Sequence, residues 1–299
     1  MNAFHFNWCP RIFSKRKSFL FAATAAVATL LGISAAKSNA AFVLMNNNST
    51  ISLSPSDPTG PGAWTVDGVN QLGEEWFWFR IGNSAGQTNL ASLPETSSML
   101  LDTTGGTENN FARFTYGSPT ALQVVLTYIL AGGQTGSGAS DLSESLDISN
   151  DGTTTQTYHF FEYTNFNLGD STTGQSVTIT GGNTATVDGN GKEAQTVVSP
   201  EPSEYEASST SAVPDLLSQI SSTTSSATLD DVASAPSGDT EWGFEWDITL
   251  KAGGSYVIAI DKDISPHAVT PVPEPAGAVA LLGVMGLMLS RPRGRRHTA

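Results

Sequence analysis

Histidine is the residue type whose chemistry is easiest to place in this sequence, because the chain has only four. Three lie near the ends or in a proline-rich stretch, and only His159 lies in the central region. A zinc site built from several histidines is therefore excluded, and a Ser-His-Asp triad would have to use His159. Its two neighbours in sequence are aromatic, and the chain has no nucleophile-elbow motif. We expect His159 to be a packed structural residue.

Carboxylates are far more numerous, with 28 Asp and Glu residues in the chain. Two close pairs, Glu74/Glu75 and Glu245/Asp247, stand beside tryptophans. Glycoside hydrolysis uses two carboxyl groups that flank the scissile bond, but spacing in sequence does not reveal their separation in space. We favour solvated strand-edge acids beside core tryptophans, and a glycan-active enzyme with paired carboxylates stays open as an alternative.

The sharpest local motif is Asp-Ile-Ser-Asn-Asp-Gly, in which Asp147, Ser149 and Asp151 match the first three ligand positions of a calcium loop. The twelfth position, which should be a bidentate glutamate, is Tyr158. The segment 150–152 between two expected strands is better explained as a hairpin turn, and the segment 187–192 has the same interpretation. We therefore expect no cofactor, while Ca²⁺ bound by these three residues stays open as an alternative.

Composition excludes several classes of function. The single cysteine, Cys9, precedes an N-terminal apolar segment, so the central domain is expected to have no disulfide and no thiol nucleophile. Five basic residues and all 28 acids lie within residues 41–290, which gives a formal net charge of 5 − 28 = −23. Such a field repels phosphate backbones and anionic lipid headgroups, so nucleic acid is not an expected partner.

The elements that must position these side chains are short strands. Residues 41–264 are rich in Ser, Thr, Gly and Asn, with aromatic and β-branched runs between turn clusters. This pattern predicts one all-β domain, a jelly-roll-like β-sandwich, which the terminal signals described below would make extracellular. Residues 242–250 alternate between apolar and polar, and the pair Gly253/Gly254 predicts a hairpin to the next strand. Pro214 and the apolar residues after it indicate a short helical insertion.

The N-terminus has the three parts of a secretory signal peptide. A basic segment precedes an apolar run, and the run ends at small residues. We expect residues 1–40 to be removed by signal peptidase between Ala40 and Ala41.

The C-terminus is organised differently. A proline-rich linker is expected at residues 265–271, followed by Pro273-Glu274-Pro275 and an apolar run at residues 276–289. That run is about 21 Å long as a helix, against a hydrocarbon thickness of about 30 Å. A cluster of arginines follows and orients the helix with its end in the cytoplasm: Arg291, Arg293, Arg295 and Arg296. The sequence predicts a single transmembrane helix of marginal length.

Together these parts, residues 272–296, resemble the PEP-CTERM sorting signal of exopolysaccharide-forming Gram-negative bacteria. The resemblance covers about the last 28 residues and implies that a membrane protease of the exosortase type acts at Pro273-Glu274-Pro275. It further implies transient anchoring in the membrane, followed by release or transfer to the cell surface or extracellular matrix, where exopolysaccharide is a candidate partner. A plain one-span anchor without processing is the alternative.

No recognisable catalytic motif accompanies this signal. The sequence therefore predicts an exported surface or matrix protein with a structural or envelope role and without catalysis. Two alternatives are a carbohydrate- or calcium-dependent matrix-binding module that uses exposed aromatics and acids, and the secreted glycan-active enzyme.

Overall fold

The computed structural model describes residues 42–266. The predicted signal peptide with Ala40 and Ala41, the sorting motif and the arginine cluster lie outside the described residues. Within them, every pairing between named strands is antiparallel, which confirms the all-β prediction. No helix in residues 42–266 is long and apolar enough to span a bilayer.

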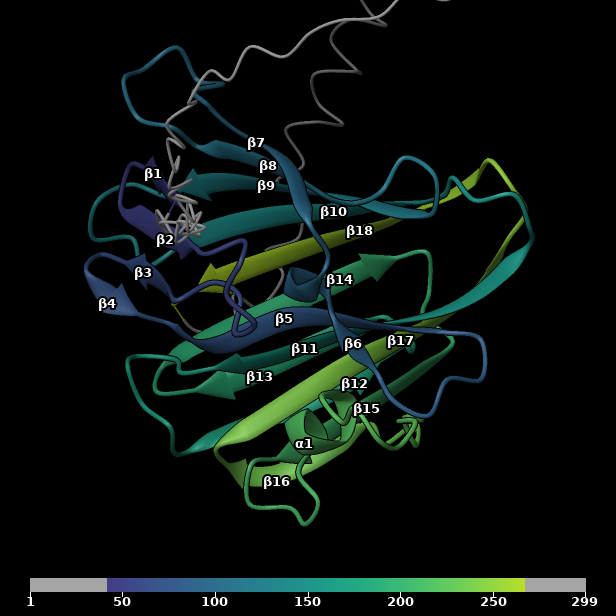
Figure 1. The fold of residues 1–299 in the computed structure, drawn as a ribbon. Helices are drawn as coiled ribbons and strands as arrows, with labels where there is room; N and C mark the ends of the chain where they lie inside the picture. The colour runs from purple at the N-terminus through teal and green to yellow at the C-terminus, as the bar shows by residue number, and fades with distance from the viewer. Residues whose placement is uncertain (1–41, 267–299) are drawn as a thin grey trace, which may run out of the picture. The chain divides into compact units, whose positions relative to one another are not determined.

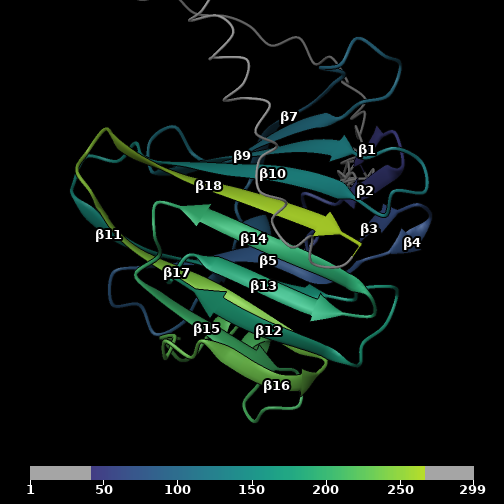
Figure 2. The same ribbon diagram turned by 180° about the vertical axis from the view of Figure 1, so that it is seen from behind.

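Two large sheets lie face to face in a sandwich-like arrangement (Figures 1 and 2). The nine-stranded sheet has the order β16 (Ser234–Gly238), β12 (Gln175–Thr180), β13 (Thr184–Gly189), β14 (Lys192–Ser199), β18 (Gly254–Ser265), β10 (Ser140–Asn150), β9 (Leu122–Gly132), β8 (Phe111–Gly117) and β7 (Glu95–Leu101). The five-stranded sheet has the order β15 (Glu204–Ser209), β17 (Thr240–Leu250), β11 (Gln156–Phe166), β5 (Leu72–Ile81) and β6 (Thr88–Asn89). A jelly-roll-like strand order stays a prediction.

Smaller elements complete the described domain. A four-stranded sheet contains β1 (Phe42–Asn46), β2 (Ser49–Leu53), β3 (Ala63–Val66) and β4 (Val69–Asn70). A short 3₁₀ helix (Leu90–Ser92) follows β6, and the helix α1 (Leu216–Ile220) confirms the predicted helical insertion. The amide of Ser218 donates to the carboxylate of Asp215, which caps the first turn of α1.

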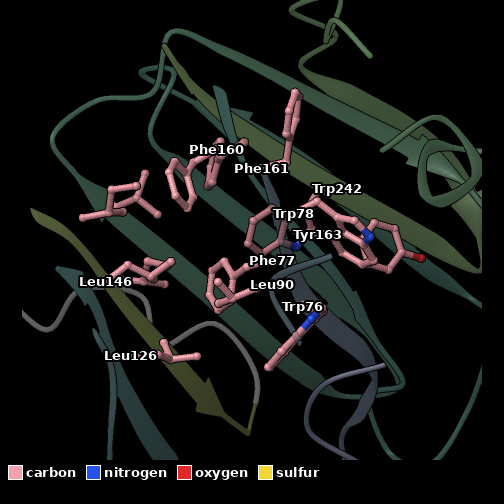
Figure 3. Packing of buried hydrophobic residues seen from close by; sticks show 14 of the residues in the cluster. Trp76, Phe77, Trp78, Leu90, Leu126, Leu146, Phe160, Phe161, Tyr163 and Trp242 are labelled. Carbon is pink, nitrogen blue, oxygen red and sulfur yellow. The ribbon is translucent and has the colours of Figure 1, made fainter. Parts of the chain in front are cut away.

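The core lies between the two large sheets, because alternate residues of β17 face the nine-stranded sheet. Trp242, Phe244 and Trp246 on this inner face are all buried, as the period of two predicted. Figure 3 shows Leu126 and Leu146 of the nine-stranded sheet beside Phe77 of β5. Aromatic residues on both faces of β5 and β11 are buried too, so these strands are covered on both sides.

The opposite, outer face of the five-stranded sheet is covered in its middle by residues 216–229, here called the covering segment. Leu216 and Ile220 of α1 are both fully buried. A Cβ on Gly243 of β17 would lie 3.0 Å from Ile220 Cδ1, so the absence of a side chain there lets α1 approach the sheet closely. The helical insertion thus packs against the sheet.

Two of the predicted hairpins are wrong. The turn at residues 150–152 joins β10 to β11, and the turn around Gly253 joins β17 to β18, but in each case the two strands belong to different sheets. At both turns the chain crosses from one large sheet to the other. Asn150 Nδ2 connects the two turns by donating a hydrogen bond to Leu250 O at 2.9 Å. The hairpin at residues 187–192 is confirmed: β13 pairs with β14 through Asn190 and Gly191, both at positive φ.

Candidate functional site

The outer face of the five-stranded sheet carries polar side chains at both of its ends, on either side of the covering segment. The strand register sets these two groups, because residues directly opposite in an antiparallel pair point to the same face. At one end Asn165 of β11 lies opposite Glu74 of β5 and Glu241 of β17. At the other end His159 of β11 lies opposite Arg80 of β5 and Asp247 of β17.

The first end is a pocket of about 260 Å³, here called the carboxylate pocket. Its described lining has four carboxyl groups and no Lys or Arg; the remaining side chains are mostly hydroxyls and amides. The lining residues are Gly73, Glu74, Tyr163, Asn165, Asn167, Thr172, Thr210, Asp215, Leu217, Asp239 and Glu241.

Glu241 is fixed within the wall of this pocket. Its Oε2 accepts a hydrogen bond from the Tyr163 hydroxyl at 2.8 Å, and its Oε1 accepts from the backbone amide of Leu216 at 2.8 Å. The residue is fully buried, and this burial raises the pKa of its carboxyl above the ordinary value. Glu241 is thus a rigid acid that the covering segment helps to hold.

Glu74, Asp215 and Asp239 are the partly exposed acids of the pocket, and Asp215 already caps α1 by accepting from the Ser218 amide. Burial raises the pKa of the Glu74 carboxyl, and the negative charges of Glu241 and Asp57 raise it further. Asp239 Oδ1 accepts a hydrogen bond from Asn165 Nδ2 at 2.9 Å, so the amide fixes this carboxylate. A carboxyl that tends to keep its proton therefore shares a pocket with a second, oriented carboxylate. That is the arrangement that general acid-base chemistry requires.

The second end, here called the histidine cluster, contains Arg80, His159, Glu245 and Asp247. His159 Nδ1 lies 3.3 Å from Glu245 Oε1 and also contacts Asp247 Oδ1, and Arg80 Nη2 lies 3.7 Å from Glu245 Oε1. His159 is thus largely buried, as predicted, but it lies in a charged cluster. The sequence interpretation of Glu245 as a solvated strand-edge acid is wrong, because its side chain is only 3% exposed.

Glu245 has a strongly perturbed carboxyl group. Burial raises its pKa to about 8, and the charges of Asp247 and Glu204 act in the same direction. The backbone amide of Leu229 and the guanidinium of Arg80 oppose this shift. The cluster can therefore hold a proton or a cation between its acids.

The calcium candidates lie elsewhere. Asp147 and Ser149 are in β10, where they pair with Val257 and Ser255 of β18, and Asp151 follows the strand. These residues belong to the nine-stranded sheet, whereas both polar groups belong to the five-stranded one. Bound Ca²⁺ stays a prediction here.

An aromatic platform for sugar stacking is not formed by the tryptophans of residues 42–266. All five of them are buried: Trp64, Trp76, Trp78, Trp242 and Trp246. These five tryptophans therefore give no support to a carbohydrate-binding module that stacks sugars on them.

Sequence reasoning noted Glu74, Glu245 and Asp247 but missed Asp239, Glu241 and the role of Arg80. The missed acids Asp239 and Glu241 lie 165 and 167 residues after Glu74 in the chain. The only local signal was the alternation of polar residues with tryptophans in residues 241–247. It predicts a polar face of the strand but not which residues of other strands lie beside that face.

Comparison with protein-family models and with curated protein sequences finds no match. Solved structures do resemble the domain. The Slr1438 protein of Synechocystis sp. PCC 6803 superposes with a TM-score of 0.52 at 11% identity, covering 76% of this chain and 96% of its own. A bacterial glucoamylase bound to acarbose gives a TM-score of 0.51 at 9% identity, covering 83% of this chain. A candidate aldose 1-epimerase from Escherichia coli K12 gives a TM-score of 0.48 at 9% identity and covers 76% of this chain and 99% of its own.

The chain spans about a third of the glucoamylase, 34% of that protein's length. At these identities the likeness shows the fold alone, and part of a bacterial glucoamylase has this fold. The prediction of a structural protein without catalysis is therefore corrected. It rested on the lack of a linear motif, and the pocket carboxylates come from separate strands and loops that form no such motif.

Proposed function

We propose that the domain is a glycan-active enzyme that cleaves glycosidic bonds in the carboxylate pocket. The observation that carries this proposal is the presence of Glu74 and Asp239 in one solvent-accessible pocket whose described lining has no basic residue. The sandwich-like fold, similar to that of part of a glucoamylase, supports it.

Each pocket residue has a role in this proposal. Glu74, whose pKa is raised by burial, is the general acid that protonates the leaving-group oxygen. Asp239, held by Asn165, is the second carboxylate, which either activates water or attacks the sugar. Glu241 is a positioning residue that keeps Glu74 protonated through its negative charge.

The lining also indicates which glycans fit. Amides and hydroxyls such as those of Asn167, Thr172 and Thr210 can exchange hydrogen bonds with sugar hydroxyls. Four carboxyl groups without a basic residue repel uronic acids and sulfated or phosphorylated sugars. The substrate class is therefore a neutral glycan, and the neutral chains of an exopolysaccharide are the first substrates to test.

The test is hydrolysis of a panel of neutral and anionic glycosides by the wild-type chain and two variants. We expect Glu74→Gln and Asp239→Asn each to lower kcat by about 10²- to 10⁴-fold, because each removes one proton-transfer or nucleophilic group. Asp147→Asn, an exposed carboxylate on the nine-stranded sheet, is the matched control and should keep full activity. Wild-type turnover that both pocket variants retain, or a complete lack of turnover on the neutral panel, would refute the proposal.

We further propose that the enzyme is exported and sorted. Residues 1–40 would direct secretion, residues 41–264 would form the extracellular domain, and residues 272–296 would act as the PEP-CTERM signal after the linker at 265–271. The support is the order of the sequence elements alone. Mass spectrometry of surface material would decide the processing step: a retained Arg295-Arg296 end contradicts cleavage near Pro273-Glu274-Pro275.

A further inference from the structure

The histidine cluster offers three ligand atoms of the types that transition metals bind. One ligand atom each from His159, Glu245 and Asp247 lies within 4.8 Å of the others. One imidazole nitrogen with two carboxylate oxygens is a donor set that suits zinc and its first-row neighbours, whereas calcium takes oxygen ligands only.

We propose that His159, Glu245 and Asp247 bind a divalent transition-metal ion of the zinc type. Two ligands about 2.1 Å from a tetrahedral zinc ion lie about 3.4 Å apart. His159 Nδ1 and Glu245 Oε1 are 3.3 Å apart, so these two atoms already have that separation. The Asp247 side chain is 46% exposed and can move to admit the ion, with water filling the remaining position.

The contacts of His159 Nδ1 are a further indication. The buried Nδ1 faces two carboxylate oxygens, Glu245 Oε1 and Asp247 Oδ1, and neither contact has the geometry of a hydrogen bond. An imidazole nitrogen that faces two carboxylate oxygens without hydrogen-bond geometry is placed as a metal ligand would be. Glu204 lies opposite Glu245 on β15, and its Oε2 is also buried without a hydrogen-bond partner in the described part of the chain.

Groups behind the ligands hold them in place. The backbone amide of Leu229 donates to Glu245 Oε2 at 3.4 Å, which leaves Oε1 directed toward His159. Arg80 Nη2 donates to the backbone oxygen of Ala227 at 3.4 Å. Such outer contacts orient metal ligands. Both contacts come from the covering segment, so a bound ion would link β11 and β17 to that segment.

The charge balance favours a cation at this position. Three carboxylates, those of Glu204, Glu245 and Asp247, lie together on adjacent strands, and Arg80 is the basic side chain within 4.0 Å of Glu245 in the described region. The guanidinium of Arg80 also donates hydrogen bonds to the backbone oxygens of Gly82 and Ala227. Only part of its hydrogen-bonding capacity is therefore available to the acids. A dication would neutralise the remaining charge.

The test is a zinc titration of the chelator-treated, purified full-length chain by calorimetry and by thermal unfolding. We expect one zinc site that stabilises the wild type, with a Tm that rises with zinc concentration and with weaker or no response to calcium. His159→Gln and Asp247→Asn should each weaken this site at least tenfold. Asp188→Asn, an exposed strand carboxylate of β13 on the other sheet, should bind zinc as the wild type does.

Zinc bound by His5, Cys9, His267 or His297 would appear equally in every variant, so the difference between variants decides the result. Equal zinc binding by wild type, His159→Gln and Asp247→Asn would overturn the proposal, as would the absence of any zinc-dependent rise in Tm. If His159→Gln does not fold, the half-exposed Asp247→Asn decides alone. Glu74→Gln should leave zinc binding unchanged, which separates this proposal from the one on glycan cleavage.

Discussion

Glu74 and Glu75 are neighbours in the sequence, yet they belong to two contrasting clusters of carboxyl groups. Glu74 points to the outer face of the five-stranded sheet and lines the carboxylate pocket. Glu75 points into the core, where it meets Lys262 of β18 together with Glu144 and Glu162. The same residue type thus serves two environments because adjacent residues of a strand face opposite sides.

The inner cluster is closed and has a central cation. Lys262 Nζ lies 3.2 Å from Glu75, 2.9 Å from Glu144 and 2.8 Å from Glu162, and all four side chains are inaccessible to solvent. Burial opposes the charge on Lys262, yet the three carboxylates together raise its pKa above the usual range. Burial also raises the pKa values of Glu144 and Glu162.

The outer pocket is open and has no cation in its described lining. Its acids are held by neutral groups, the Tyr163 hydroxyl and the Asn165 amide. Three acids that surround an internal lysine join the two sheets and are closed to solvent. The acids of the outer pocket are held by neutral donors and are open to a ligand. The inner cluster is therefore structural, and the outer one is the chemical site.

The largest effect that would test this contrast is expected from Lys262→Met. Removing the cation leaves three carboxyl groups buried without an ion-pair partner, which should lower the free energy of unfolding by about 3–5 kcal/mol. Urea denaturation measures this change. Lys251→Met, in an exposed turn, is the control and should change the free energy by less than about 0.5 kcal/mol. Equal stabilities of the two variants would mean that the inner cluster does not hold the sheets together.

The second-largest expected effect is a contribution of the inner cluster to the pH dependence of stability. The pKa of Glu144 is raised in the folded protein, so its contribution is fully present below the unfolded value and is lost as pH rises toward the folded value. The side chain of the Glu144→Gln variant stays neutral at every pH. The free energy of unfolding of this variant should therefore fall less steeply between pH 5 and 7 than that of the wild type, by up to about 1.4 kcal/mol per pH unit. Asp188→Asn, exposed on β13, should keep the wild-type slope, and an unchanged slope in Glu144→Gln would refute this account.

The sequence predicted the all-β fold because the alternation of apolar and polar residues in a strand is visible within a short stretch of sequence. Asn190-Gly191 likewise predicted its hairpin, since two residues at positive φ form that turn. The turns after β10 and β17 have similar chemistry but lead to the other sheet. Turn residues specify how the chain bends, and the partner of the next strand depends on which buried face it covers.

The site was less predictable for the same reason. Treating Glu74/Glu75 as one pair hid the fact that the two side chains point to opposite faces. Asp239 precedes β17 and reaches Asn165 only because β17 lies beside β11 in one register. Non-local pairing of this kind leaves no mark in a short window of sequence, and neither does the covering segment that buries Glu241.

The smallest expected effect tests how the outer pocket is tuned. After burial, the charge of Glu241 is the next cause of the raised pKa of Glu74, and Asp57 follows. The general acid must be protonated, so activity is lost as pH rises through the pKa of Glu74. Glu241→Gln removes the charge and keeps the side-chain shape, so the alkaline limb of kcat/KM should move to lower pH.

Asp57→Asn should move that limb in the same direction by less, because the charge of Asp57 is the weaker cause and its side chain is more exposed to solvent. Profiles of kcat/KM against pH for the wild type and the two variants measure both shifts. A limb that stays in place in Glu241→Gln, while Glu74→Gln is inactive, would show that Glu74 donates its proton without tuning by its buried neighbour. The raised pKa of Glu74 would then be due to burial alone. The outer pocket and the inner cluster would differ only in their access to solvent.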